Sequence, residues 1–124
     1  MKFKLLTLTI VGTLFMPAAT VSAAGLPGWY APLSGLPHQS TWRCILHAES
    51  RSTFIHPNLG DNNPNGSSGV FQIEQATWAA HQLAARVPAR VHVWQASLYQ
   101  QARVAAAIWR ADGFSPWRSD GCVA

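Results

Sequence analysis

The chain has only two cysteines, Cys44 and Cys122, and they stand far apart in its 124 residues. A disulfide between them would close a loop of nearly eighty residues. In the chain-entropy view such a bridge stabilises a fold by roughly 4 kcal/mol, because it restricts the unfolded chain. It would also tie the C-terminal tail to the segment around Glu49. Two free, buried thiols are the alternative, and the choice between them depends on the redox compartment.

Residues 1–23 have the features of a secretory signal peptide. A basic start is followed by an apolar run over residues 5–16 and by the small-residue cleavage site Val21-Ser22-Ala23. The apolar run is short for a bilayer span, so an uncleaved membrane anchor is the less favoured interpretation. We therefore expect a secreted or periplasmic, cell-wall-associated protein without stable membrane insertion after signal removal. Export also favours the disulfide over free thiols.

Removal of the signal lowers the net charge. Both lysines lie within it and none of the five acidic residues does, so seven arginines remain against five acids and the charge falls from +4 to +2. A weakly basic chain without a Lys/Arg run is not typical of nucleic-acid binding. Weak attraction to an anionic cell wall would account for the charge. About a hundred residues remain, enough for one small domain, and we expect a monomer.

Three segments predict helices. Residues 40–50 form the first, with Ser40 as its N-cap. Residues 72–85 form the second, and residues 96–111 the third, whose apolar stripe is so wide that the helix must be largely buried. Gly113 stands where a glycine stop belongs.

Two other segments are rich in proline and glycine. Residues 24–39 predict an irregular lead-in, and residues 40–124 then form the domain. Residues 52–68 predict a turn-rich loop with at most a small hairpin around Phe54 and Ile55. The fold class is therefore mainly α, of the α+β kind, with a turn-rich loop or short hairpin beside the first helix.

Glu49 is one of two glutamates and lies on the first predicted helix, near Trp42, Ile45 and Leu46. Apolar surroundings disfavour the charged carboxylate and raise its pKa toward neutrality. A protonated carboxyl of this kind can donate a proton to the leaving oxygen of a glycosidic bond. Taken with the helix alone, an ordinary surface glutamate is the alternative.

The segment from Gly69 to Gln72 suits the floor of a sugar-binding cleft. Gly69 would let a glycan approach the backbone, and Gln72 offers a donor and an acceptor. Trp78 is a candidate stacking platform, although a tryptophan on an amphipathic helix is more often part of the core. Phe71 has the same two interpretations.

Together these segments resemble the lysozyme-like superfamily of bacterial muralytic enzymes, closest to resuscitation-promoting factors and related small secreted transglycosylase-like proteins. The motifs that carry the resemblance are Cys44-x-x-x-x-Glu49-Ser50, Gly69-Val70-Phe71-Gln72-Ile73, Thr77-Trp78 and Gly113-x-x-x-Trp117 before the last cysteine. The resemblance covers residues 42–122. It implies a lysozyme-like fold with Glu49 as the catalytic acid. It also implies that Gly69, Phe71 and Gln72 lie in the cleft near the sugar. With Ser50 and Trp78, these residues are the candidate substrate-binding positions. The Ala-x-Asn-Ile element of soluble lytic transglycosylases is not matched, because residues 105–108 lack the asparagine.

The outcome of the reaction depends on a second carboxylate. We expect only Asp61 to be able to serve as base or ion stabiliser. Glu74 should point elsewhere, and Asp112 and Asp120 come late in the chain. If Asp61 is only a turn former, Glu49 acts alone, as in a lytic transglycosylase, where the 6-hydroxyl of the sugar attacks and an anhydro product forms.

Other chemistries find little support. Residues 61–66 match the front half of a calcium loop, but Gln72 stands where a bidentate glutamate is needed. Cys44 and His47 give only half a zinc pattern, and neither a serine-nucleophile elbow nor a phosphate-binding loop is present. We therefore expect no metal, no cofactor and no nucleic-acid partner.

The sequence thus predicts a peptidoglycan-cleaving enzyme of the lytic transglycosylase type, which acts on the N-acetylmuramyl to N-acetylglucosamine bond through Glu49. One alternative is a hydrolytic lysozyme that uses Asp61 as second carboxylate. Another is a non-catalytic peptidoglycan-binding or signalling protein. The enzyme is favoured because a pure binder has no need of a costly, partly buried carboxyl.

Overall fold

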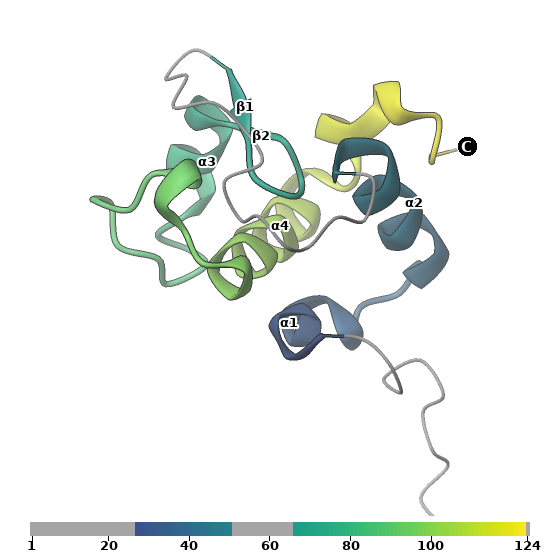
Figure 1. Cartoon of the computed structure of the whole chain (residues 1–124), viewed down its shortest axis with the longest axis horizontal. Helices are drawn as coiled ribbons and strands as arrows, with labels where there is room; N and C mark the ends of the chain where they lie inside the picture. The colour runs from purple at the N-terminus through teal and green to yellow at the C-terminus, as the bar shows by residue number, and fades with distance from the viewer. Residues whose placement is uncertain (1–26, 51–65, 124) are drawn as a thin grey trace, which may run out of the picture.

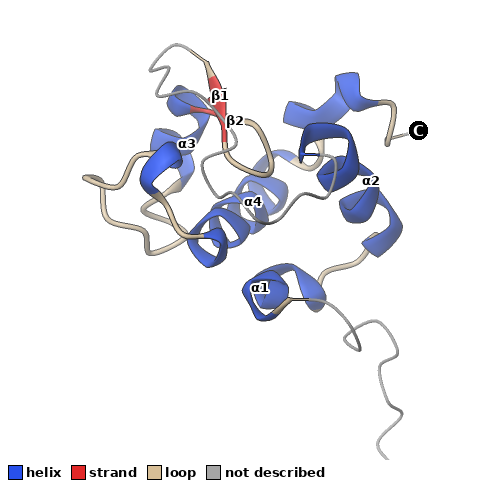
Figure 2. Ribbon diagram, viewed as in Figure 1, coloured by secondary structure: helices blue, strands red, loops and turns tan. Residues whose placement is uncertain are grey.

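The computed structural model of the chain describes residues 27–50 and 66–123 (Figure 1). These residues form a mainly helical structure with one small antiparallel hairpin (Figure 2), which confirms the mainly helical prediction. With η for a 3-10 helix, the elements in chain order are η1 (Gly28–Tyr30), α1 (Ala31–Ser34), α2 (Gln39–Ser50), β1 (Ser67–Ser68), β2 (Ile73–Glu74), α3 (Gln75–His81), η2 (Val93–Gln95), α4 (Leu98–Asp112) and η3 (Ser115–Asp120).

Helix α4 lies at the centre of the fold and matches the third predicted helix within two residues at its start and one at its end. Ser97 caps it, since its side chain accepts a hydrogen bond from the Gln100 backbone N–H at 3.1 Å while the Gln100 side chain accepts one from the Ser97 backbone N–H at 3.0 Å. Gly113 ends it with a positive φ of 63°, as the sequence predicts. Its residues are largely buried, which confirms the prediction from the wide apolar stripe.

The second predicted helix is shorter than expected at both ends. Gln72 has a φ of 48°, and the next two residues pair with β1 instead, in the register Ser67 with Glu74 and Ser68 with Ile73. Beyond His81 the chain turns back. The buried Gln82 side chain holds this turn by donating to the carbonyl of Pro88 at 2.6 Å.

The lead-in is not irregular throughout, and this part of the prediction is wrong. Residues 28–34 form helical turns in which Tyr30 and Leu33 are buried and pack on α4. The Gln39 side chain joins these turns to α2, because its amide donates to the carbonyls of Leu33 and Leu36, each at 2.7 Å. Helix α2 begins at Gln39, so Ser40 lies inside it and is not the N-cap.

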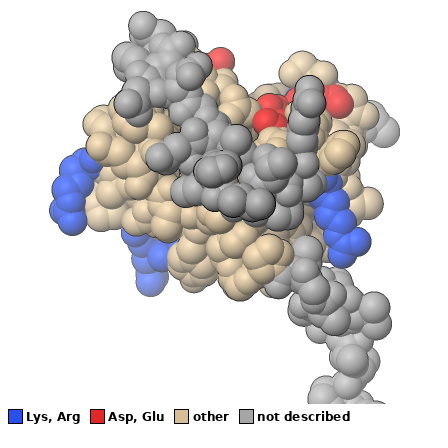
Figure 3. Space-filling model, in the orientation of Figure 1, with Lys and Arg blue, Asp and Glu red and all other residues tan. Residues whose placement is uncertain are grey.

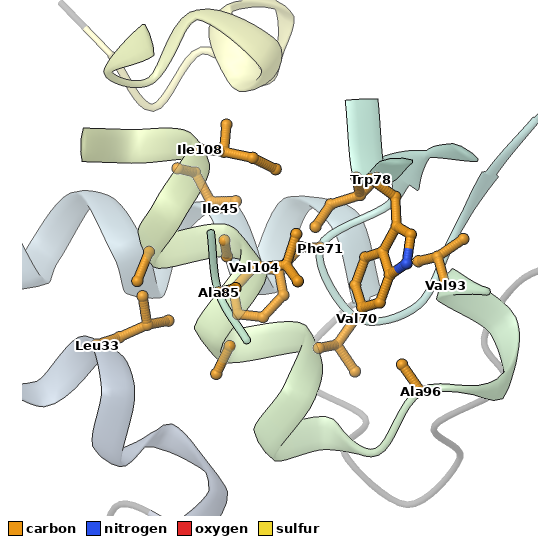
Figure 4. Close-up of a cluster of buried hydrophobic side chains, with 14 of the residues drawn as sticks. Leu33, Ile45, Val70, Phe71, Trp78, Ala85, Val93, Ala96, Val104 and Ile108 are labelled. Atoms are coloured by element: carbon orange, nitrogen blue, oxygen red, sulfur yellow. The ribbon is translucent and has the colours of Figure 1, made fainter. Parts of the chain in front are cut away.

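The core forms where α4 meets α2, α3 and the hairpin turn. Figure 4 shows Val104 and Ile108 of α4 in one cluster with Ile45 of α2, Phe71 of the hairpin turn and Trp78 of α3. Three of the chain's tryptophans, Trp42, Trp78 and Trp117, are fully buried. Such large side chains account for much of the apolar area that folding removes from water.

A disulfide joins Cys44 of α2 to Cys122, just beyond η3, with the two Cα atoms 5.6 Å apart. This confirms the pairing predicted from the sequence. In Figure 1 the C-terminal segment, drawn in yellow, lies against α2. None of the helices within residues 27–50 and 66–123 has the length and apolar character needed to span a bilayer. The signal peptide and the hairpin expected at Phe54 and Ile55 lie outside the described residues.

Candidate functional site

An open cleft of about 880 Å³ contains the predicted catalytic residue. Glu49 contributes from the last turn of α2, residues 72–74 from the hairpin, and Thr77 and His81 from α3. Ser119 and Asp120 of η3 also line the cleft, with Asp120 beside Glu49. The volume of the cleft lies in the range of small-molecule sites, and the hydroxyl and amide groups that line the cleft suit a polar ligand.

The environment of Glu49 favours its protonated carboxyl. Burial, followed by a hydrogen bond to the Asp120 side chain and the negative charge of Asp120, together raise the pKa of the carboxyl from 4.5 to about 8. The group also stands in the last turn of a helix, where the helix dipole disfavours an anion. At neutral pH the carboxyl is therefore mostly protonated while open to the cleft.

Asp120 is a residue of the candidate site that the sequence interpretation missed. Its dismissal as an acid late in the chain is wrong, since Asp120 lines the cleft beside Glu49. The sequence did contain a signal that Asp120 lies near Glu49. Cys122 follows Asp120 by two residues, and its disulfide partner Cys44 precedes Glu49 by five. The Oδ2 atom of Asp120 is buried and has no hydrogen-bond partner in the described part of the chain.

Hydrogen bonds to buried side chains hold the hairpin turn at residues 69–72 in place. The Val70 backbone N–H donates to Gln101 Oε1 at 2.9 Å, and the Trp117 ring N–H donates to the Phe71 carbonyl at 2.9 Å. Gln72 closes the turn, because its side-chain amide donates to the Gly69 carbonyl at 2.8 Å. This places Gln72, in its left-handed backbone conformation, on the wall of the cleft.

The other expected substrate contacts are structural. Gly69 is buried with a φ of 79°, and a Cβ there would meet the Gln101 side chain, with Cδ at 2.8 Å, so the glycine makes room for packing and not for a glycan. Phe71 is buried at the edges of Trp42 and Trp117. Neither residue lines the cleft.

Trp78 and Ser50 also differ from their expected role. Trp78 is fully buried and its ring N–H donates to the Val91 carbonyl at 2.8 Å, so it is not a stacking platform. Ser50 is buried and its hydroxyl donates to the Leu46 carbonyl at 2.7 Å. Of the five predicted substrate contacts, only Gln72 lines the cleft.

The cleft gathers the acidic residues. Glu49, Glu74, Asp112 and Asp120 are the four acids within the described ranges, and all four line it, which corrects the expectation that Glu74 points elsewhere. Figure 3 shows the acidic side chains at the upper edge of the view and the basic ones at the sides and below. Asp112 pairs with His81, whose Nε2 lies 3.1 Å from Asp112 Oδ2.

Asp61 and most of the partial calcium pattern lie outside the described residues. Within the described ranges, no three His, Cys, Asp or Glu side chains gather closely enough to hold a metal ion. Comparisons with models of protein families, with curated proteins and with solved structures found no match to this chain.

Proposed function

We propose that the chain is a secreted, lysozyme-like muralytic enzyme that cleaves the N-acetylmuramyl to N-acetylglucosamine bond of peptidoglycan, with Glu49 as the proton donor. The observation that carries the proposal is a carboxyl with a pKa of about 8 on the wall of an open cleft of about 880 Å³. A glycosidic bond breaks when such a group protonates the leaving oxygen while positive charge develops on the sugar ring.

The surroundings of Glu49 support a glycan as the substrate. Gln72, Ser67, Thr77 and Ser119 line the cleft with groups that donate and accept hydrogen bonds, as sugar hydroxyls and N-acetyl groups require. The other three acids of the cleft, Glu74, Asp112 and Asp120, add negative potential near the place where an oxocarbenium-like centre would form. Negative potential stabilises that centre more than it stabilises the neutral substrate.

The place of Asp120 supports a mechanism with a single acid. Glycosidases that use two carboxylates hold them about 5 Å or more apart, with the sugar or a water molecule between them. Asp120 instead raises the pKa of Glu49 through a side-chain hydrogen bond and through its charge, so the two carboxyl groups are close neighbours. Asp120 therefore acts on the proton of Glu49 and does not attack the sugar or activate a water across it.

This arrangement favours the lytic transglycosylase outcome, in which the 6-hydroxyl of the muramyl sugar replaces water as nucleophile. A hydrolytic lysozyme would need a further carboxylate, and Asp61 is the candidate. The substitution Asp61→Asn separates the two, because it keeps the turn-forming side chain but removes the base. Retention of most activity supports the transglycosylase; a loss of about a hundredfold in turnover supports the lysozyme.

The proposal is tested by lysis of purified peptidoglycan with Glu49→Gln. The amide keeps the size of the side chain but cannot supply the proton, so we expect activity to fall by about a hundredfold or more with the fold unchanged by circular dichroism. Glu74→Gln is the matched control, because Glu74 is the other glutamate of the cleft and is exposed. Wild-type lysis by Glu49→Gln would refute the assignment. So would equal losses in the two variants.

A further inference from the structure

A second hollow of about 500 Å³ lies between α1, the turn after α3 and the exposed face of α4. We call it the arginine groove, after Arg86, Arg103 and Arg110, which line it together with Tyr99. The rest of its lining consists of alanines and Pro32, small residues that leave the space open. Among the residues that the structure describes, no acidic one lines the groove.

The charges of the groove have no counterpart in the described part of the chain. All four described acids line the cleft, and none of the three groove arginines forms an ion pair within residues 27–50 and 66–123. Helix α4 keeps the two sets apart, since Arg110 lines the groove while Asp112 lines the cleft. Three guanidinium groups around one hollow repel one another, and a bound anion would relieve that repulsion.

Two local features prepare the groove for a ligand. Arg86 has a φ of 57°, a left-handed conformation that a residue with a Cβ adopts only at a cost in energy. The turn after α3 nevertheless has an arginine at this unfavourable backbone position. Arg103 lies over the ring of Tyr99, 5.9 Å from its centroid, which orders one guanidinium before any ligand arrives. Tyr99 itself is 47% exposed, so part of the side chain is open to a ligand.

The spacing of the charges suits a polymer. Arg103 and Arg110 are seven residues apart on one helix, which separates their Cα atoms by about 10 Å along the axis. Two arginine side chains so placed can converge on one small anion, whereas a polymer with repeated oxyanions meets each arginine in its own position; the comparison of polyphosphate with inorganic phosphate separates the two. Arg86, from a different segment, adds a third contact beside them.

We propose that the arginine groove binds an anionic polymer through repeated phosphate or carboxylate groups, at a site separate from the cleft. Arginine recognises both kinds of oxyanion, because its planar fork of N–H donors can bind two oxygens at once. An anionic polymer bound in the arginine groove would leave the acidic cleft open to an uncharged glycan. The attraction is electrostatic and should weaken as salt rises.

The test measures binding of the disulfide-bonded mature chain to inorganic polyphosphate and to polygalacturonate, by calorimetry at fixed low salt. We expect Arg103→Gln with Arg110→Gln to weaken binding by about tenfold or more, because two charge-assisted contacts are lost. The control carries Arg43→Gln and Arg90→Gln, which remove the same charge outside the groove. It should bind within about threefold of wild type, as expected for screened distant charges.

Several outcomes would overturn the proposal: equal losses in the two double variants, failure of both polymers to bind, or inorganic phosphate that binds as tightly as polyphosphate. Binding of only one polymer would retain the proposal and identify the oxyanion. If the double variant fails to fold, Arg110→Gln alone, at an exposed position, provides the same comparison against Arg90→Gln alone. Glu49→Gln should bind the polymers as wild type does, so this result is independent of the proposed lytic activity.

Discussion

Glu49 owes its high pKa to two causes that substitution can separate. Burial is the larger cause, and the hydrogen bond and charge of Asp120 are the smaller ones. Burial comes from the helix and the packing around it, whereas the Asp120 contributions come from one side chain 71 positions later. The contribution of burial was predictable from the apolar neighbours of Glu49. The contribution of Asp120 was not, because it requires knowledge of how the C-terminal segment returns to α2.

Asp120→Asn should lower the pKa of Glu49 without returning it to its ordinary value, because the negative charge is lost while burial remains. Lysis depends on protonated Glu49, so its loss at alkaline pH should begin at a lower pH in the variant. Asp112→Asn is the control, since Asp112 lines the same cleft but pairs with His81. An unchanged pH profile in Asp120→Asn, or the same change in both variants, would contradict the role given to Asp120.

The elements show where local sequence decides structure and where it does not. Helix α4 was predicted closely, because its apolar stripe and its glycine stop are both local. The end of α3 was not, since the buried Gln82 side chain ends it through contacts with residues further along. The hairpin turn was misread for a similar reason. Gly69 serves the packing of Gln101, a residue on α4 that no local pattern connects to it.

The disulfide should matter for stability and for the site together. Replacement of Cys44 and Cys122 by serine should lower the free energy of unfolding by up to about 4 kcal/mol, because the loop no longer restricts the unfolded chain. If the bridge also holds η3 against α2, the pH above which lysis is lost should become lower, as in Asp120→Asn. Thermal unfolding and the pH profile of the double variant measure both effects. An unchanged unfolding midpoint would contradict the first, and an unchanged profile would contradict the second.

Across the whole molecule, the fold separates charge, with acids around the cleft and arginines around a groove on another face. The buried Glu49 in the cleft makes stability depend on pH with a definite sign. The pKa of Glu49 is higher in the folded chain than in the unfolded chain, so the folded chain holds this proton more tightly. The stability gained in this way is fully present below about pH 4.5 and is lost as pH rises to about 8.

Comparison of the wild-type chain with Glu49→Gln isolates this dependence, because glutamine does not titrate and the other groups are shared. The difference in the free energy of unfolding between the two should change between about pH 4.5 and 8, with the wild type losing stability relative to the variant as pH rises. Denaturant titrations at several pH values would measure it. A constant difference, or one of opposite sign, would contradict the raised pKa.

The central claim is that Glu49 donates a proton to a glycosidic bond of peptidoglycan, and mass spectrometry of a digest tests it most directly. The account predicts that the wild-type chain releases muropeptides with anhydromuramyl ends and that Glu49→Gln releases none. Reducing ends would keep Glu49 as the acid but replace the transglycosylase with a hydrolase. Absence of any released muropeptide from the folded wild-type chain would contradict the account and leave a protein that binds glycan without cleaving it.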